Sequence, residues 1–115
     1  MLETAVYARL QDLASGRVFA GVAPLETPTP RLSYAVVSEP FGFVLGGADG
    51  SSTPSIQVDI WAASRLEALQ VGTEVIAALG AETEAFCVVG LTRLADETDE
   101  ATGLERVAYE FTLAR

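Results

Sequence analysis

The segment that most constrains the fold is residues 55–69, which read SIQVDIWAASRLEAL. Its first half places Ile or Val at every second position, the period of a strand that buries one face. A few residues later, Ser64 and Glu67 have the spacing of a capping box, in which each side chain bonds the backbone of a new helix. The segment therefore predicts a strand that is followed almost directly by a helix.

Asp59 and Trp61 fall on the strand face opposite the Ile and Val side chains. If helices cover the apolar face, Asp59 and Trp61 point toward solvent or a partner. Tryptophan is enriched where protein interfaces concentrate their binding energy, which makes Trp61 a candidate contact residue. The alternative is that Trp61 folds against its own sheet or over the start of the helix.

The other segments alternate between helical and extended patterns. We expect an amphipathic helix over 2–14, a short strand near 17–24, a proline-rich connector over 24–30, a strand from 31, a loop over 46–54, a helix from 64 to about 80, and strands over 85–96 and 103–115. This order predicts an α+β fold with two helices packed on one face of a mainly antiparallel β-sheet and a C-terminal β-hairpin. The length of the chain predicts one domain, residues 1–115.

The composition excludes several classes of function. The chain has 16 acidic residues against 7 basic ones, a net charge of −9, and no histidine. This balance disfavours a groove that grips nucleic-acid phosphates, and the lack of histidine removes the commonest general base and most zinc sites. No apolar run approaches the ~20 residues that span a bilayer, and we expect a soluble protein that is not exported. The lone Cys87 is expected to be a small buried hydrophobe.

Asp96, Glu97, Asp99 and Glu100 form the densest cluster of ionisable side chains. Four carboxylates could hold calcium, but their spacing lacks the alternating ligands and glycine of an EF-hand loop. A solvated, acidic hairpin tip is the preferred interpretation. We expect no metal and no cofactor.

Catalytic residues are scarce. Asp59 with Glu110 is the one carboxylate pair that can be constructed, and cross-strand acids of this kind are usually solvated. The chain also has no lysine. We therefore predict that the protein is not an enzyme.

The glycine-rich segment 46–54 contains Gly46, Gly47, Asp49 and Ser51. A phosphate-binding loop runs straight into a helix N-terminus, whereas here a strand intervenes before the helix. We expect this segment to be a projecting loop.

Taken together, the motifs resemble those of the small tail-terminator, or tail-completion, proteins of long-tailed phages and phage-like particles. The matching pieces are ASGRVFAGVAP after the first helix, PRLSYAVVSE, IQVDIWAASRLEALQVGTEVIAAL and DETDEATGLERVAYEFTLAR. The resemblance covers nearly the whole chain, is weakest over 46–54, and rests on the order and spacing of motifs that are not catalytic.

The resemblance implies a structural virion protein that caps the tail tube as a ring, typically a hexamer, stops tube polymerisation and provides the docking surface for the head connector. The implied partners are further copies of the chain, the tail tube protein and the connector. DNA would pass through without specific binding, no membrane would be involved, and the protein would reside in the tail or neck of the virion after assembly in the host cytoplasm.

We therefore treat ten residues as candidate interface residues: Trp61, Asp59, Gly46, Gly47, Asp49, Ser51, Asp96, Glu97, Asp99 and Glu100. Two alternatives remain open at this point. One is another neck or connector adaptor at the head–tail interface. The other is a small-ligand binding module that uses the sheet face around Asp59 and Trp61.

Overall fold

The structure is a computed structural model that describes residues 2–24, 26–44, 47–81 and 86–114. Its elements, in chain order, are α1 (Leu2–Leu10), the 3-10 helix η1 (Leu13–Gly16), β1 (Val18–Ala20), β2 (Arg31–Ser38), β3 (Phe41–Val44), β4 (Gly47–Ser52), β5 (Ser55–Ala62), α2 (Arg65–Gly80), β6 (Cys87–Arg93), β7 (Glu97–Thr98) and β8 (Glu105–Ala114).

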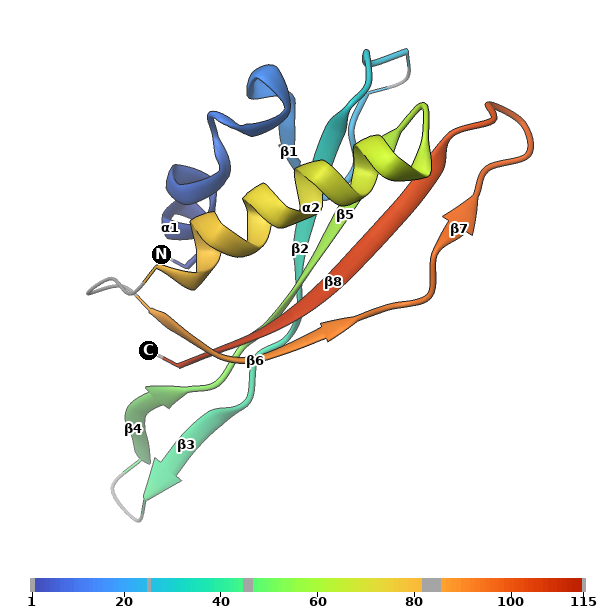
Figure 1. Ribbon diagram of the computed structural model, residues 1–115. Helices are drawn as coiled ribbons and strands as arrows, with labels where there is room; N and C mark the ends of the chain where they lie inside the picture. Colours follow the sequence, from blue (N-terminus) through green and yellow to red (C-terminus); the bar gives the residue numbers. More distant parts are fainter. Residues whose placement is uncertain (1, 25, 45–46, 82–85, 115) are drawn as a thin grey trace.

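The main sheet has the strand order β1-β2-β5-β8-β6, with the short β7 paired to β8 beyond β6. Every pairing in this sheet is antiparallel except that of β1 with β2. Helix α2 runs across one face of the sheet, and α1 packs beside it (Figure 1). The predicted α+β fold, with two helices on one face and a C-terminal hairpin of β6 and β8, is confirmed.

Alternation along β5 sets the layers of the molecule. Ile56, Val58 and Ile60 are almost completely buried, whereas the residues between them are only half-buried. The buried side chains join those of α1, α2 and β8 in one core. At about 25 cal/mol per Å² of apolar surface, each such side chain contributes on the order of 2 kcal/mol.

The predicted helix start is confirmed at Ser64. The Glu67 backbone N–H donates to Ser64 Oγ at 3.2 Å, and Ser64 itself is extended, as an N-cap residue should be. The Glu67 carboxylate accepts from the backbone N–H of Ala63 at 3.4 Å, one residue earlier than in the standard capping box.

The first helix is shorter than predicted. Instead of continuing to residue 14, α1 ends at Leu10 and the chain forms the 3-10 turn η1. Ala14, Ser15 and Gly16 all have positive φ angles, of 50°, 55° and 82°. This tight left-handed turn buries Ala14 and redirects the chain into β1, a tertiary requirement that overrides the helical pattern.

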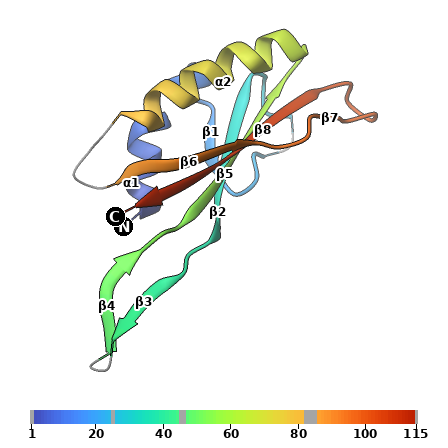
Figure 2. The same cartoon turned by 60° about the horizontal axis from the view of Figure 1, so that its bottom comes forward.

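The prediction that 46–54 is a loop is wrong over residues 47–52, which form β4 and pair antiparallel with β3. Gly46 lies outside the described residues. The β3–β4 hairpin, hereafter the arm, extends from the ends of β2 and β5 away from the helices, and helps to make the molecule 52 Å long but only 24 × 23 Å in cross-section (Figures 1 and 2). Glycine and serine disfavour strands, so composition concealed this one, but the pairing gives both segments backbone hydrogen-bond partners.

Helix α2 approaches the sheet closely at Gly72. A Cβ atom added there would lie 2.8 Å from Tyr109 Cε2 and 2.9 Å from Tyr109 Oη. Tyr109 is buried in the core, so its ring has little room to move aside. Gly72 therefore allows α2 to sit on β8.

We predict that Gly72→Ala lowers the free energy of unfolding by about 1–2 kcal/mol, since overpacking costs about 1–3 kcal/mol and the better helix propensity of alanine returns up to about 1 kcal/mol. Gly80→Ala is the matched control, because nothing lies within 4 Å of its added Cβ. It should leave stability unchanged or raise it slightly. Urea denaturation measures both, and equal effects of the two substitutions would contradict this packing.

Candidate functional site

On the sheet face opposite the helices, arginine and tryptophan side chains alternate from strand to strand. Trp61 of β5 is in register with Arg31 of β2 on one side and with Arg106 of β8 on the other. Directly paired side chains in a sheet share a face and stand about 5 Å apart at Cβ. The half-buried indole of Trp61 therefore lies between two cationic side chains.

Asp59 is bound into the same polar face. Its Oδ1 accepts a hydrogen bond from Gln57 Nε2 at 2.9 Å and lies 3.9 Å from Arg106 Nη1. Its cross-strand partner is Ala108, whereas Glu110 is paired with Gln57. Asp59 and Glu110 are thus not direct neighbours, and the Asp59 carboxylate is balanced by a cation.

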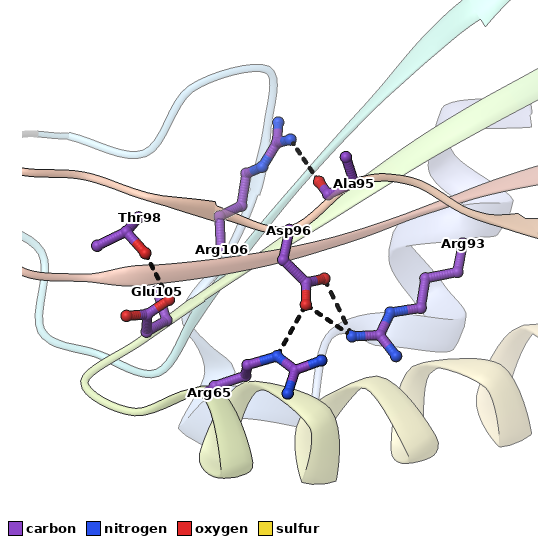
Figure 3. A network of polar contacts seen from close by, with 7 residues as sticks. All are labelled: Arg65, Arg93, Ala95, Asp96, Thr98, Glu105 and Arg106. Atoms are coloured by element: carbon purple, nitrogen blue, oxygen red, sulfur yellow. Dashed lines mark hydrogen bonds and ion pairs between the residues drawn. The ribbon is translucent and has the colours of Figure 1, made fainter.

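Arg106 connects this face to β7. Its side chain is 15% exposed, and its Nη2 lies 3.4 Å from Glu97 Oε1 and donates to the Ala95 carbonyl at 3.2 Å (Figure 3). Among the described residues, its buried Nε has no hydrogen-bond partner, and the same holds for Arg31 Nε. The guanidinium groups of the two arginines beside Trp61 therefore use only some of their nitrogens in hydrogen bonds or ion pairs.

A hollow of about 240 Å³ on this face brings three of the predicted residues together: Asp59, Trp61 and Asp99. Its other walls are Arg31, Ser33 and the segment 21–23 that follows β1. A larger, mainly apolar depression of about 680 Å³ adjoins it between the proline-rich connector and the hairpin tip, where Asp99 lines both. The open face is thus hollowed where the connector and the tip approach each other.

Asp96 is exposed, as predicted, but it precedes β7 and is not part of the hairpin tip. Its Oδ2 accepts from Arg65 Nε at 2.8 Å and from Arg93 Nη2 at 2.8 Å, so that it joins the start of α2 to the end of β6 (Figure 3). Glu97 lies in β7, and Asp99 closes the turn by accepting from the backbone N–H of Gly103 at 2.7 Å. Only Asp99 and Glu100 belong to the tip itself.

The cluster around Asp96 lowers the pKa of its carboxyl below the ordinary value. The hydrogen bond from Arg65 is the main cause, partial burial opposes it, and the hydrogen bond and charge of Arg93 add to the lowering. In the core beneath α1, burial, together with Tyr7 and Glu3, raises the pKa of the Tyr34 hydroxyl.

The ten predicted residues therefore fall into separate places. Asp59, Trp61 and Asp99 line the open face. Glu97 is connected to this face by its ion pair with Arg106. Asp96 forms ion pairs with two arginines on the helix side. The backbones of Gly47, Asp49 and Ser51 lie in the arm.

Sequence reasoning missed the four arginines at positions 31, 65, 93 and 106 because their importance depends on cross-strand register. The alternation of Arg106 with the buried residues of β8 was the one available signal.

Within residues 2–24, 26–44, 47–81 and 86–114, no three His, Cys, Asp or Glu side chains gather as a metal site. Over the same ranges, no helix combines the length and apolarity needed to cross a membrane. What the described surface offers is an open sheet face, a hollow and a projecting arm.

A scan of protein-family models and a search of curated proteins gave no match to this sequence. Among solved structures, a chain from the virion of a native gene transfer agent particle is similar, with a TM-score of 0.69 and 20% sequence identity. The match covers 99% of this chain and 95% of the other. At this level of identity, the similarity establishes a shared fold over the full length of both chains.

We predict that the Asp96 carboxyl titrates below the ordinary aspartate range in an NMR pH titration, and that Arg65→Gln moves its pKa back up. Because the folded pKa is lowered, the contribution of this cluster to stability is present above the ordinary pKa and is lost as the pH falls through the folded pKa. Exposed ion pairs are worth about 0.5 kcal/mol, so the stability loss in Arg65→Gln at neutral pH should be of that order.

Arg9→Gln is the control, because Arg9 donates to the Ala78 and Ala81 carbonyls at the other end of α2. An Asp96 titration that is unchanged by Arg65→Gln, or changed equally by Arg9→Gln, would show that the cluster does not form in solution.

Proposed function

We propose that this chain is a structural protein of a phage-like virion that caps the tail tube as a hexameric ring, ends tube polymerisation and presents the docking surface for the head connector. The observation that carries the proposal is the fold shared with a chain of the gene transfer agent virion over 99% of this chain and 95% of that one. Two chains that match end to end have the same elements available for the same kind of assembly. The motif order of the tail-terminator family supports the more specific role.

The shape of the molecule suits ring formation. A closed ring requires heterologous contacts, in which one patch of a subunit meets a different patch of its neighbour. The arm projects from one end of the body (Figure 2). The hollow beside Trp61 lies on the open sheet face, so the arm and this face are separate surfaces. In the proposal, residues 1–115 act as one tail-terminator-like domain.

The candidate contact residues divide by role. Asp59, Trp61 and Asp99, with Glu97 and Glu100 near them, would form a docking surface on the open face and tip. Asp96 would act indirectly, by fixing the segment that leads into the tip. The arm, with Gly46, Gly47, Asp49 and Ser51, would contact neighbouring subunits.

The negative charge of the chain suits a ring through which DNA passes without being bound. A net charge of −9 repels phosphates, and the arginines beside Trp61 are already engaged with Asp59, Glu97 and backbone carbonyls. We propose that the protein has no catalytic activity, needs no cofactor, contacts no membrane, and binds further copies of itself, the tail tube protein and the head connector. It would reside in the tail or neck after assembly in the host cytoplasm.

Deletion of the gene from the producing particle tests the role directly. Without the terminator, tube polymerisation has no stop, so electron micrographs should show overlong tails without heads. Tails of normal length beside DNA-filled heads would contradict termination and favour a joining adaptor instead. Complementation with the wild-type gene is the control.

We predict that Trp61→Ala leaves a folded protein that still ends the tail tube but no longer joins tails to heads. Truncating a tryptophan at the centre of an interface costs about 2 kcal/mol or more, which weakens association by about 30-fold. Tyr7→Ala is the control, because Tyr7 is an exposed aromatic residue on α1. Circular dichroism checks the fold, and tails joined to heads as in wild type with Trp61→Ala would remove Trp61 from the docking surface.

A further inference from the structure

The arm has no strand partner outside itself in the described part of the chain. Its two strands form a sheet of their own, and β3 and β4 pair only with each other (Figure 1). A two-stranded hairpin is marginally stable by itself in water. Strand β3 nevertheless reads Phe-Gly-Phe-Val, an apolar sequence that is costly to leave in solvent.

Strand β6 is an edge that remains open within the described part of the chain. It pairs with β8 on one side only and carries two exposed apolar side chains, Val89 at 62% and Leu91 at 44% exposure. Natural edge strands usually carry charges or proline that discourage pairing with another chain. The segment Cys87–Arg93 contains no proline and no acidic residue, and its one charged residue is Arg93.

The opposite edge of the sheet is a poorer acceptor. Strand β1 has three residues, and after it the chain enters the connector that contains Pro24, Pro28 and Pro30. A partner strand could therefore add few hydrogen bonds there. On β6, a bulge between Val88 and Gly90 leaves the regular stretch 90–93, which has the same length as the four residues of β3.

The charge distribution favours contact between these two segments in particular. The chain has 16 acidic residues, so most pairs of its surfaces repel each other. Segment 41–52 contains one acid, Asp49, and no base, whereas 87–93 contains one base and no acid. The arm and the β6 edge are thus two surfaces that can approach without like-charge repulsion.

We propose that β3 of one copy adds as a strand along residues 90–93 of the β6 edge of a second copy, where it would cover the exposed Leu91 and adjoin Val89. The contact is heterologous, because arm and edge are different parts of the chain, so repetition around an axis closes a ring. The inference rests on the proposed ring and identifies the contact between its subunits. The arm leaves the body from β2 and β5, and its strand β3 pairs with β4 rather than with β6 of the same chain, so the proposed addition is intermolecular.

Two variants test this contact. Each is called a half-variant because it lacks either the acceptor edge or the arm. Val89→Glu with Leu91→Glu places charges on the acceptor edge. In the second variant, two glycines replace residues 41–52, which the structure permits because Thr53 N–H already donates to the Pro40 carbonyl at 3.4 Å. Leu66→Glu is the matched control, since Leu66 is 67% exposed in the first turn of α2, away from both surfaces.

Native mass spectrometry over a range of concentrations up to millimolar measures the number of copies in each assembly. Wild type and Leu66→Glu should form rings, and each half-variant alone should be a folded monomer with a circular dichroism spectrum like that of wild type. Mixed together, the two half-variants should form a 1:1 dimer and nothing larger, because one supplies only an arm and the other only an edge.

A mixture that stays monomeric, a half-variant that assembles as wild type does, or a wild type that is monomeric at every concentration would overturn the inference. Rings formed equally by every variant would remove this contact and leave the proposed function standing. Normal tails in the deletion strain would remove the proposed function, while a 1:1 dimer in the mixture would still support the contact.

Discussion

The pairing of β5 between β2 and β8 is the constraint on which the rest of the structure depends. β8 is in register with β5 over its whole length and β2 is in register with it from Ile56 to Trp61, so the alternation of β5 fixes which face of the sheet is buried. Ile56, Val58 and Ile60 turn one face toward α2 and the core. A shift of one residue would bury Asp59 and Trp61 and expose the core. The buried face and the open face are therefore set by the same interaction.

The contacts proposed for this chain use the surfaces that the pairing of β5 leaves uncovered. With both helices on one side, the other side keeps Trp61 between Arg31 and Arg106, above a hollow that the connector and the tip enclose. The ends of β2 and β5 continue into an arm whose strands, among the described residues, pair only with each other (Figure 2). An open face, an open edge at β6 and an arm whose first strand has an apolar sequence are surfaces suited to binding other subunits.

Local patterns predicted the elements well where local physics decides them. The alternation of β5 and the side chain of Ser64 act within a few residues, and both were interpreted correctly. The arm was not predicted, because glycine and serine obscure a strand that exists through its pairing with β3. Asp96 was assigned to a solvated tip, because its partners Arg65 and Arg93 come from elements that only the tertiary fold brings together. The candidate residues therefore remain a prediction, and their arrangement could not be predicted because it depends on cross-strand register and tertiary contacts.

The central claim is that this chain assembles as a ring at the end of a tail tube. Electron cryomicroscopy of the intact particle measures this most directly, because it locates every copy of the chain at once. The account predicts six copies in one ring at the head-proximal end of the tail, with the arm of each copy lying along β6 of the next. Density for this chain elsewhere in the particle, or in a single unpaired copy, would contradict it.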